Sequence, residues 1–331
     1  MSGTDGTIEL AHSRSADGGL ALQYSQEQGT YQHQHPKVNR FPDHEVAIPE
    51  MADYELEESA KIHPMYDPLN WPLMSSRYRF REYLAEFWGT FILIFFGDGV
   101  VATTTFNKSG AQAAYLAVTF GWGVGLTMAL YISMGISGGH LNPAVTFSNA
   151  VWGKFSWRKV PGYMLAQFLG AFVAAATLYG IFKDQFDVFD GGNRQLMGDQ
   201  GTGGIWCTYA KPGNGKFFSA WSEIVNTAVL LFVIYGIGDL RMTPAKNHLP
   251  IAIGLLVFAI GNCTGWVTGY AINPARDFGP RVFSTILYGK EPFTFDGHYF
   301  WVPLFMPFVG ATLGIFFYQF FIVPERKTKK E

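Results

Sequence analysis

The sequence predicts an all-α membrane protein with six transmembrane helices, two re-entrant half-helices and an inverted internal repeat. Three observations carry this prediction: long apolar runs, few charged residues, and a motif that occurs in each half of the chain. Hydrophobic residues make up 48% of the 331 residues, aromatic residues 17% and charged residues only 15%. Soluble domains average about a quarter charged residues, so the composition favours a protein that faces lipid.

Composition divides the chain into three parts. Residues 1–76 are polar and hold five of the eight histidines. We expect a disordered cytoplasmic tail here, because such a segment cannot bury enough apolar surface to offset its chain entropy. Residues 77–323 form the predicted membrane domain, with repeat one at about 80–182 and repeat two at about 218–323, and residues 324–331 form a second tail. The net charge of −2 gives no reason to expect a nucleic-acid partner.

Six apolar runs are long enough to cross a bilayer, which takes about 20 residues. They are predicted at 81–104, 112–135, 160–182, 218–238, 249–269 and 299–323. With six spans, the loops and tails richest in Lys and Arg fall on one side of the membrane. Positive charge marks the cytoplasmic side, so both termini are expected in the cytoplasm.

Two shorter stretches, 137–152 and 268–288, are interpreted as half-helices. Each contains an Asn-Pro pair, in which an N-cap residue precedes proline at the first helical position. The pairs are Asn142-Pro143 and Asn273-Pro274. Each following helix has about 10 to 15 residues, and at 1.5 Å per residue it reaches only about halfway through the bilayer. The backbone that leads into it must line an aqueous cavity, because unpaired backbone groups are too costly in lipid.

The two halves of the chain match each other in sequence. Residues 136–145 align with residues 267–276 at an offset of 131, and Glu86 aligns with Glu223 at an offset of 137. Gly170-Ala171 and Gly310-Ala311 form a third pair in the same order. Each half holds three spans, an odd number, so the halves insert with opposite topology, which places a shared site near the midplane.

Two segments resemble the aquaporin superfamily (major intrinsic protein). They read Gly-Gly-His-Leu-Asn-Pro-Ala-Val-Thr at 138–146 and Gly-Tyr-Ala-Ile-Asn-Pro-Ala-Arg-Asp-Phe-Gly-Pro-Arg at 269–281. Asp277 after Arg276 resembles the glycerol-facilitator (aquaglyceroporin) branch. The resemblance covers about 80–323 and implies a passive channel for glycerol, other small uncharged solutes and water that excludes protons and ions. It also implies a homotetramer with one pore per subunit, in the plasma membrane.

The resemblance implies a narrow filter whose members are identified by their offset from the two motifs. These are Trp122, Gly261, Tyr270 and Arg276. The two aromatic rings would form an apolar wall for a carbon backbone. Arg276 would donate to hydroxyl oxygens and repel cations, and Gly261 would leave width. Water-selective members typically place phenylalanine at the Trp122 position and histidine at the Gly261 position.

The two motifs are expected to meet at the centre of the pore. They comprise Asn142, Pro143, Ala144, Asn273, Pro274 and Ala275. A helix N-terminus carries about half an elementary positive charge, so two facing ends repel cations. Each Asn amide can cap its helix and donate to a passing hydroxyl, which interrupts a proton-conducting water chain. Pore-lining backbone carbonyls are expected from Gly138, Gly139, His140, Gly269, Tyr270 and Ala271.

Three acidic residues are expected to support this framework. Glu86 and Glu223 should accept backbone N–H groups of the re-entrant loops, because an unpaired buried carboxylate is expensive. The alternative for these two residues is a proton relay. Asp277 is expected to brace its loop.

Three other functions remain open at this point. An orthodox water channel is the nearest alternative. A secondary active transporter also uses inverted repeats and broken helices, but it needs coupling-ion ligands, for which Glu86 and Glu223 are the only candidates considered. A membrane enzyme is not expected, because the spans show no nucleophile with a base and no metal-spaced His/Cys set. We expect no cofactor and no metal, and the expected partners are glycerol, water and the lipid bilayer.

Overall fold

The structure, a computed structural model, describes residues 73–107 and 110–323. They all belong to one unit, His44–Glu331. Residues 1–72 and 324–331, where the two tails are predicted, lie outside the described residues. The predicted boundary at residue 76 falls inside a short helix, α2 (Met74–Arg79).

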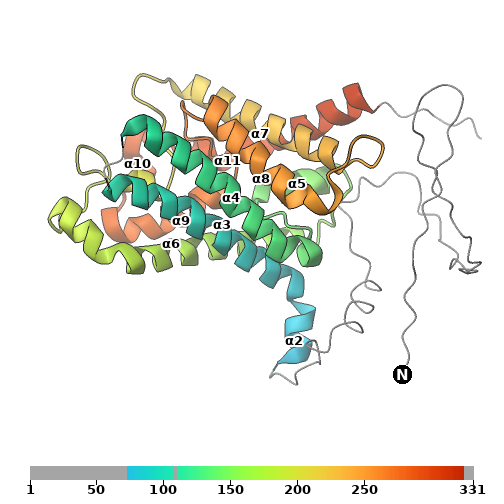
Figure 1. Cartoon of the computed structure of the whole chain (residues 1–331), viewed down its shortest axis with the longest axis horizontal. Helices are drawn as coiled ribbons and strands as arrows, with labels where there is room; N and C mark the ends of the chain where they lie inside the picture. The colour runs from blue at the N-terminus through green and yellow to red at the C-terminus, as the bar shows by residue number, and fades with distance from the viewer. Residues whose placement is uncertain (1–72, 108–109, 324–331) are drawn as a thin grey trace, which may run out of the picture. The chain divides into compact units, whose positions relative to one another are not determined.

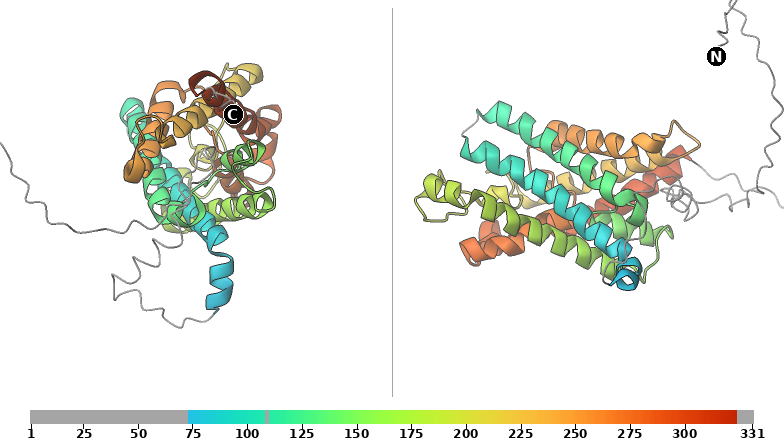
Figure 2. Two further views of the ribbon diagram at one scale, coloured as in Figure 1. Left: turned by 90° about the vertical axis from the view of Figure 1, so that its right-hand side faces the viewer. Right: turned by 60° about the horizontal axis from the view of Figure 1, so that its bottom comes forward.

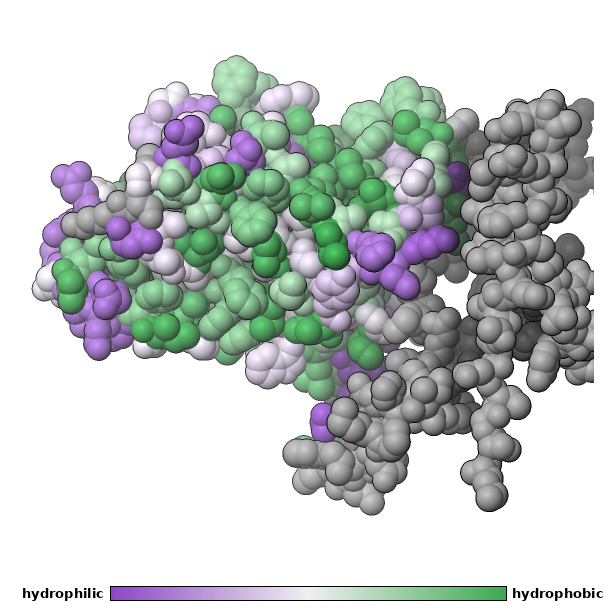
Figure 3. Space-filling view, viewed as in Figure 1, coloured by the Kyte–Doolittle hydropathy of each residue, from purple (hydrophilic) through white to green (hydrophobic). Residues whose placement is uncertain are grey.

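Six helices in the described residues are long and apolar enough to cross a membrane. They are α3 (Arg81–Phe106), α4 (Ala111–Ser137), α6 (Val160–Asp190), α7 (Lys216–Gly238), α8 (Leu249–Thr264) and α11 (Trp301–Phe317). They run side by side as a bundle (Figure 1), and one face shows a broad apolar band between hydrophilic groups at its ends (Figure 3). The predicted number of spans is confirmed, and the chain is an integral membrane protein.

Some helix bounds differ from the prediction. Helix α6 continues to Asp190 rather than ending at 182, and Gly191 then ends it in the left-handed conformation. This extension is held by packing, since its Phe186 stacks on Trp206 of the following loop at 5.7 Å between ring centroids. Helix α8 ends at Thr264 rather than at 269. A π-helical turn, Tyr318–Ile322, follows α11, and a short helix, α10 (Glu291–His298), was not predicted.

The two half-helices appear as α5 (Pro143–Val151) and α9 (Pro274–Tyr288). Each begins directly after an asparagine in extended conformation, whose side chain accepts a hydrogen bond from the first turn. At 1.5 Å per residue, the 9 residues of α5 span about 14 Å and the 15 of α9 about 23 Å, less than the roughly 30 Å of a bilayer core.

Each short helix packs against the last long helix of the other repeat. Helix α5 contacts α11, and α9 contacts α6. Trp152, at the end of α5, donates from Nε1 to the Thr312 carbonyl at 3.2 Å. Gly279 of α9 lies so close to α6 that an added Cβ would be 2.5 Å from that of Ala171. The two repeats therefore interlock around the middle of the bundle (Figure 2).

Glycines set the closest contacts between long helices at matching positions of the two repeats. An added Cβ on Gly170 would lie 2.3 Å from the Phe87 carbonyl oxygen of α3. On Gly310 it would lie 2.2 Å from the Ile224 carbonyl oxygen of α7. Membrane helices approach closely through such residues because lipid gives no hydrophobic drive for their association.

Candidate functional site

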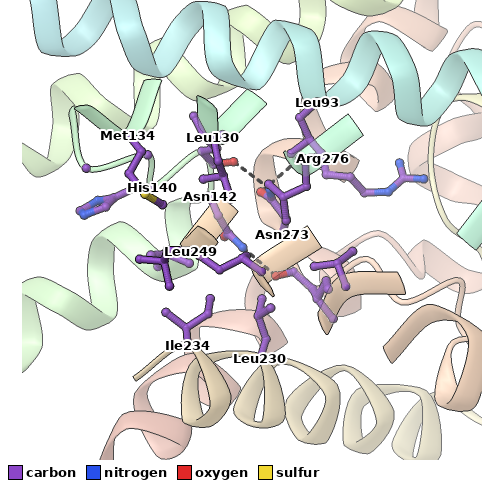
Figure 4. A pocket seen from close by; sticks show the side chains of 18 of the residues that line it. Leu93, Leu130, Met134, His140, Asn142, Leu230, Ile234, Leu249, Asn273 and Arg276 are labelled. Carbon is purple, nitrogen blue, oxygen red and sulfur yellow. Dashed lines mark hydrogen bonds between the residues drawn. The ribbon is translucent and has the colours of Figure 1, made fainter. Parts of the chain in front are cut away.

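A cavity lies at the junction of the two repeats (Figure 4). Its walls are mostly apolar side chains from α3, α4, α7 and α8, together with the loops that lead into α5 and α9. The apolar residues include Leu93, Leu126, Leu130, Met134, Val145, Leu230, Ile234, Leu249, Ile253 and Val257. Figure 4 shows Arg276 on one side of the two central asparagines, and Met134 and His140 on the other. Trp122 lies against Arg276, whereas Tyr235 of α7 lies against Asn149 in the later part of α5. We call these two sides the Arg276 end and the Asn149 end.

The two asparagines meet at the centre of the cavity and tie the repeats together (Figure 4). Asn142 Nδ2 donates to the Ile272 carbonyl at 2.9 Å, and Asn273 Nδ2 donates to the Leu141 carbonyl at 2.8 Å. Each Oδ1 caps its own helix by accepting from the backbone, of Ala144 in α5 and of Ala275 in α9. An amide has two donor hydrogens, so each asparagine keeps one N–H for a solute in the cavity.

The backbone leading into each short helix is turned so that it can present carbonyls. Leu141 and Ile272 have φ values of 50° and 43°, in the left-handed region that non-glycine residues rarely adopt. Of the six predicted pore carbonyls, Gly138, Gly139, His140, Tyr270 and Ala271 line the cavity. Gly269 instead lies against Thr208, whose Cγ2 would be 3.2 Å from an added Cβ.

Two buried glutamates hold these strained segments. Glu86 of α3 accepts from the backbone N–H of His140 at 2.9 Å and of Leu141 at 2.7 Å. Glu223 of α7 accepts from the backbone N–H of Ala271 at 3.0 Å and of Ile272 at 2.8 Å. Both carboxylates are fully buried.

Glu86 has two further donors, Ser137 Oγ at 2.6 Å and Gln167 Nε2 at 2.7 Å. Its oxygens are therefore occupied by four hydrogen bonds with described residues, which supports a bracing role over a proton relay.

The Arg276 end brings together three of the four predicted filter residues. The Arg276 guanidinium lies over the Trp122 ring, with Cζ 4.2 Å from the ring centroid. Its Nη1 donates to the Trp206 carbonyl at 3.2 Å. Tyr270 lines the same part of the cavity. Two aromatic rings and one cationic donor group therefore line the cavity.

Gly261 plays a different part from the one predicted. A Cβ added there would lie 2.7 Å from Cζ of Tyr270 and 3.0 Å from its hydroxyl oxygen. The Tyr270 ring therefore occupies the space that the missing side chain leaves, and Gly261 does not itself widen the cavity. Tyr115 fixes this backbone from outside by donating to the Gly261 carbonyl at 2.6 Å.

Comparison with known proteins agrees with this geometry. The family model described as "Major intrinsic protein" matches residues 73–318. The chain belongs to the major intrinsic protein family.

Curated relatives and a solved structure narrow the place of the chain within the family. It is 52% identical to "Aquaglyceroporin-3" of Trypanosoma brucei brucei over 252 residues, which cover 76% of this chain and 82% of the relative. It is 47% identical to "Aquaglyceroporin-2" of the same organism, over 76% of this chain and 80% of the relative. The X-ray structure of the aquaglyceroporin from Plasmodium falciparum superposes with a TM-score of 0.66 at 35% identity, covering 74% of this chain and 97% of that one.

Asp277 lies outside the cavity wall of this family member and fixes the loop between α6 and α7. Its carboxylate accepts from Thr208, through both the backbone N–H and the hydroxyl, at 2.8 Å each. Arg281 donates to the same carboxylate at 2.7 Å and to the Thr208 carbonyl at 2.7 Å. The loop that supplies the Trp206 carbonyl to Arg276 is thereby attached to α9.

The same loop holds Cys207, and burial raises the pKa of its thiol to about 11. The other cysteine, Cys263, is exposed on α8. Among the described residues no group of three His, Cys, Asp or Glu side chains could hold a metal ion.

Two features of the site were not predicted from the sequence. Asp98 of α3 is fully buried, with Oδ1 3.6 Å from Nη1 of Arg276. At the Asn149 end, Tyr235 donates to Asn149 Oδ1 at 2.6 Å. Asp98 could have been found in the sequence, because an ionisable residue inside an apolar span is a functional candidate by default. The Tyr235 contact joins α7 to α5 and has no comparable sequence signal.

Proposed function

We propose that this chain is a passive channel for glycerol, other small uncharged solutes and water, and that it excludes protons and ions. The observation that carries the proposal is that two aromatic rings, Trp122 and Tyr270, and the donors of Arg276 border one cavity. A polyol needs both surfaces at once, an apolar one for its carbon backbone and donors for its hydroxyl oxygens. The aquaglyceroporin relatives support the same conclusion.

At the Arg276 end, a glycerol molecule turns its carbons to the aromatic rings. Its hydroxyls replace lost hydration with hydrogen bonds from Arg276 and to backbone carbonyls such as that of Tyr270. Nη1 of Arg276 is occupied by Trp206, so Nε and Nη2, which donate to no described protein group, are the donors left for solute.

At the centre, the free N–H of Asn142 and of Asn273 donates to the passing oxygen. The N-termini of α5 and α9 both point to this place, and each carries about half a positive charge. Cations are repelled there, and a water whose oxygen accepts from both amides cannot relay a proton along the chain. In this proposal Glu86, Glu223 and Asp277 support the framework and the chain carries out no chemical conversion.

The test is stopped-flow light scattering on proteoliposomes, comparing uptake from a glycerol gradient with shrinkage in an impermeant sucrose gradient. The informative variant combines Trp122→Phe, Gly261→His and Tyr270→Ala. The third change is needed because a histidine at position 261 collides with the Tyr270 ring. We expect fast glycerol uptake by the natural chain, and slow glycerol uptake with retained water flow by the variant.

Two results would contradict the proposal. Fast water flow with glycerol uptake no faster than in empty liposomes would make the chain an orthodox water channel. Uptake that saturates at low millimolar solute or needs a proton gradient would make it a secondary transporter. The four hydrogen bonds to Glu86 argue only against its being a coupling-ion ligand, because its oxygens are already occupied.

The proposal also covers the orientation of the chain in the membrane, its oligomeric state and the membrane in which it lies. We propose that both termini are cytoplasmic, which the Lys- and Arg-rich loops support, and that the channel is a homotetramer in the plasma membrane, which the family resemblance supports. Protease access to tags at the two ends of the chain in intact cells tests the orientation. Light scattering from the purified protein in detergent tests the tetramer.

A further inference from the structure

Asp98 is a buried acidic residue that the proposed pathway does not use directly. It lies on α3, and its side chain has no exposed surface. Neither carboxylate oxygen accepts a hydrogen bond from any residue in the described part of the chain. A buried ionised carboxylate without partners is strongly disfavoured, so Asp98 can carry a charge only if a cation nearby compensates it.

The compensating group is Arg276. Its Nη1 lies 3.6 Å from Asp98 Oδ1, and this is the ion pair that each of them makes among the described residues. Nη1 also donates to the Trp206 carbonyl, so Asp98 and Trp206 hold the same corner of the guanidinium. The opposite corner, Nη2, remains available to the cavity.

Gly97, the residue before Asp98 on α3, contacts the Trp122 ring of the filter. A Cβ added to Gly97 would lie 2.2 Å from the Trp122 ring, so the ring rests directly on the helix backbone. Two consecutive residues of α3 therefore contact the filter, Gly97 against Trp122 and Asp98 against Arg276. The same short stretch of α3 makes both contacts, so it supports the constriction from one side.

We propose that Asp98 is a positioning residue that neutralises the Arg276 guanidinium, so that the constriction offers solutes hydrogen-bond donors with little net charge. The inference rests on the proposed function and adds how the positive charge of Arg276 is balanced in the filter. Two consequences follow. Cation exclusion depends mainly on the helix ends at Asn142 and Asn273, and removal of Arg276 alone exposes the pore to the negative charge of Asp98.

Proton flux into proteoliposomes tests this, with an entrapped pH-sensitive dye and an imposed potential. The single variant Arg276→Leu should raise proton flux at least tenfold over the natural chain, because the unpaired carboxylate attracts cations. The double variant Asp98→Asn/Arg276→Leu should return it to within about twofold of the natural chain. Equal leaks in the single and double variants would overturn the proposal.

A second double variant, Asp98→Leu/Arg276→Leu, covers the case in which Asn at position 98 prevents folding. Replacing both members of a buried ion pair by apolar residues is often tolerated. It should also lack the leak, and a leak as large as that of Arg276→Leu would overturn the proposal.

The single variant Asp98→Asn tests the opposite imbalance, in which the positive charge of Arg276 is left without its partner. It leaves the Arg276 charge uncompensated, so nitrate should slow glycerol uptake at least twofold relative to gluconate, which is too bulky for the constriction. Uptake by the natural chain should not differ between the two salts. Nitrate insensitivity of the variant would show that Asp98 does not set the filter charge. Failure of the natural chain to take up glycerol would overturn the proposed function, whereas the proton measurements would still decide the role of Asp98.

Discussion

The Arg276 end and the Asn149 end of the cavity are related by the internal repeat, yet they carry different chemistry. The pairs of equivalent positions, at offsets of 131 and 137, are Asp98 with Tyr235, Trp122 with Ile253, Gly261 with Leu130, Tyr270 with Gly139, and Arg276 with Val145. The five positions toward the Asn149 end all line the cavity. At these five pairs of positions, one end therefore has charged and aromatic side chains, and the other has aliphatic residues, a glycine and one tyrosine in a neutral hydrogen bond.

The framework around these positions is the same in both halves. Each repeat has a buried glutamate that accepts hydrogen bonds from a loop with left-handed φ values. Each also has a glycine at which the last span packs closely on the first span of the same repeat. Duplication thus supplies the geometry of the pore, and selectivity is added by side chains on one side only. Changes to the shared framework should harm both halves alike, whereas changes to the filter should matter only at the Arg276 end.

The largest effect is expected from the shared glutamates. Glu86→Ala and Glu223→Ala each leave two buried backbone N–H groups without acceptors, at about 1 to 3 kcal/mol for each group. Folded protein should be nearly lost in both, with Glu86→Ala the worse because Ser137 and Gln167 both lose their acceptor, whereas Glu223→Ala removes the acceptor of Thr268 alone among side chains. Fluorescence-detected size exclusion after heating measures this. Asp184→Ala, at an exposed position, is the control, and a stable Glu223→Ala protein would contradict the shared brace.

The next effect concerns Gly261 and its counterpart Leu130. Gly261→Ala should push the Tyr270 ring into the passage, since the new Cβ would lie 2.7 Å from Tyr270 Cζ. We expect glycerol permeability to fall about tenfold, which corresponds to about 1.4 kcal/mol. Adding Tyr270→Ala should restore it. Leu130→Gly, the matching change at the other end, should not slow glycerol. An unchanged rate in Gly261→Ala would mean that the ring has another place to go.

Much of the framework could be predicted from the sequence because it depends on local and periodic signals. Apolar length located the six spans, and the Asn-Pro pairs located the starts of α5 and α9. The position of Tyr270 against Gly261 was not predictable, because it depends on how a loop from one segment packs on a helix from another. The bonds from Asn142 to Ile272 and from Asn273 to Leu141 depend likewise on left-handed φ values at non-glycine residues.

A smaller difference between the halves lies at the end of α7. Asp239 accepts from the backbone and guanidinium of Arg241 and from Tyr318 Oη at 2.8 Å, whereas the equivalent position in repeat one is Ala102. The side-chain hydrogen bonds from Arg241 lower the pKa of Asp239 to about 2. Its folded pKa is thus below the unfolded value of about 3.9. The stabilisation is present above about pH 4 and is lost as pH falls through about 2.

Asp239→Asn should therefore lower the melting temperature at pH 7 by about 2 to 4 °C, for about 1 kcal/mol, after allowing for the exposure of Arg241. The difference from the natural chain should shrink as pH approaches 2.5. Thermal melts of the purified protein in detergent at several pH values measure this, with Asp199→Asn at an exposed position as control. A difference that stays constant with pH would show that the carboxylate charge is not involved.

The smallest effect is expected at Tyr235, the counterpart of Asp98. Tyr235→Phe removes one neutral hydrogen bond, to Asn149 Oδ1 at 2.6 Å, at a cost of about 0.5 to 1.5 kcal/mol. No charge is created or uncovered, so proton exclusion should not change, and glycerol permeability should change by less than about twofold. The same assays used for Asp98→Asn apply. If Tyr235→Phe made glycerol uptake sensitive to nitrate, the two ends would share a charge mechanism, and the contrast drawn between them would have to be given up.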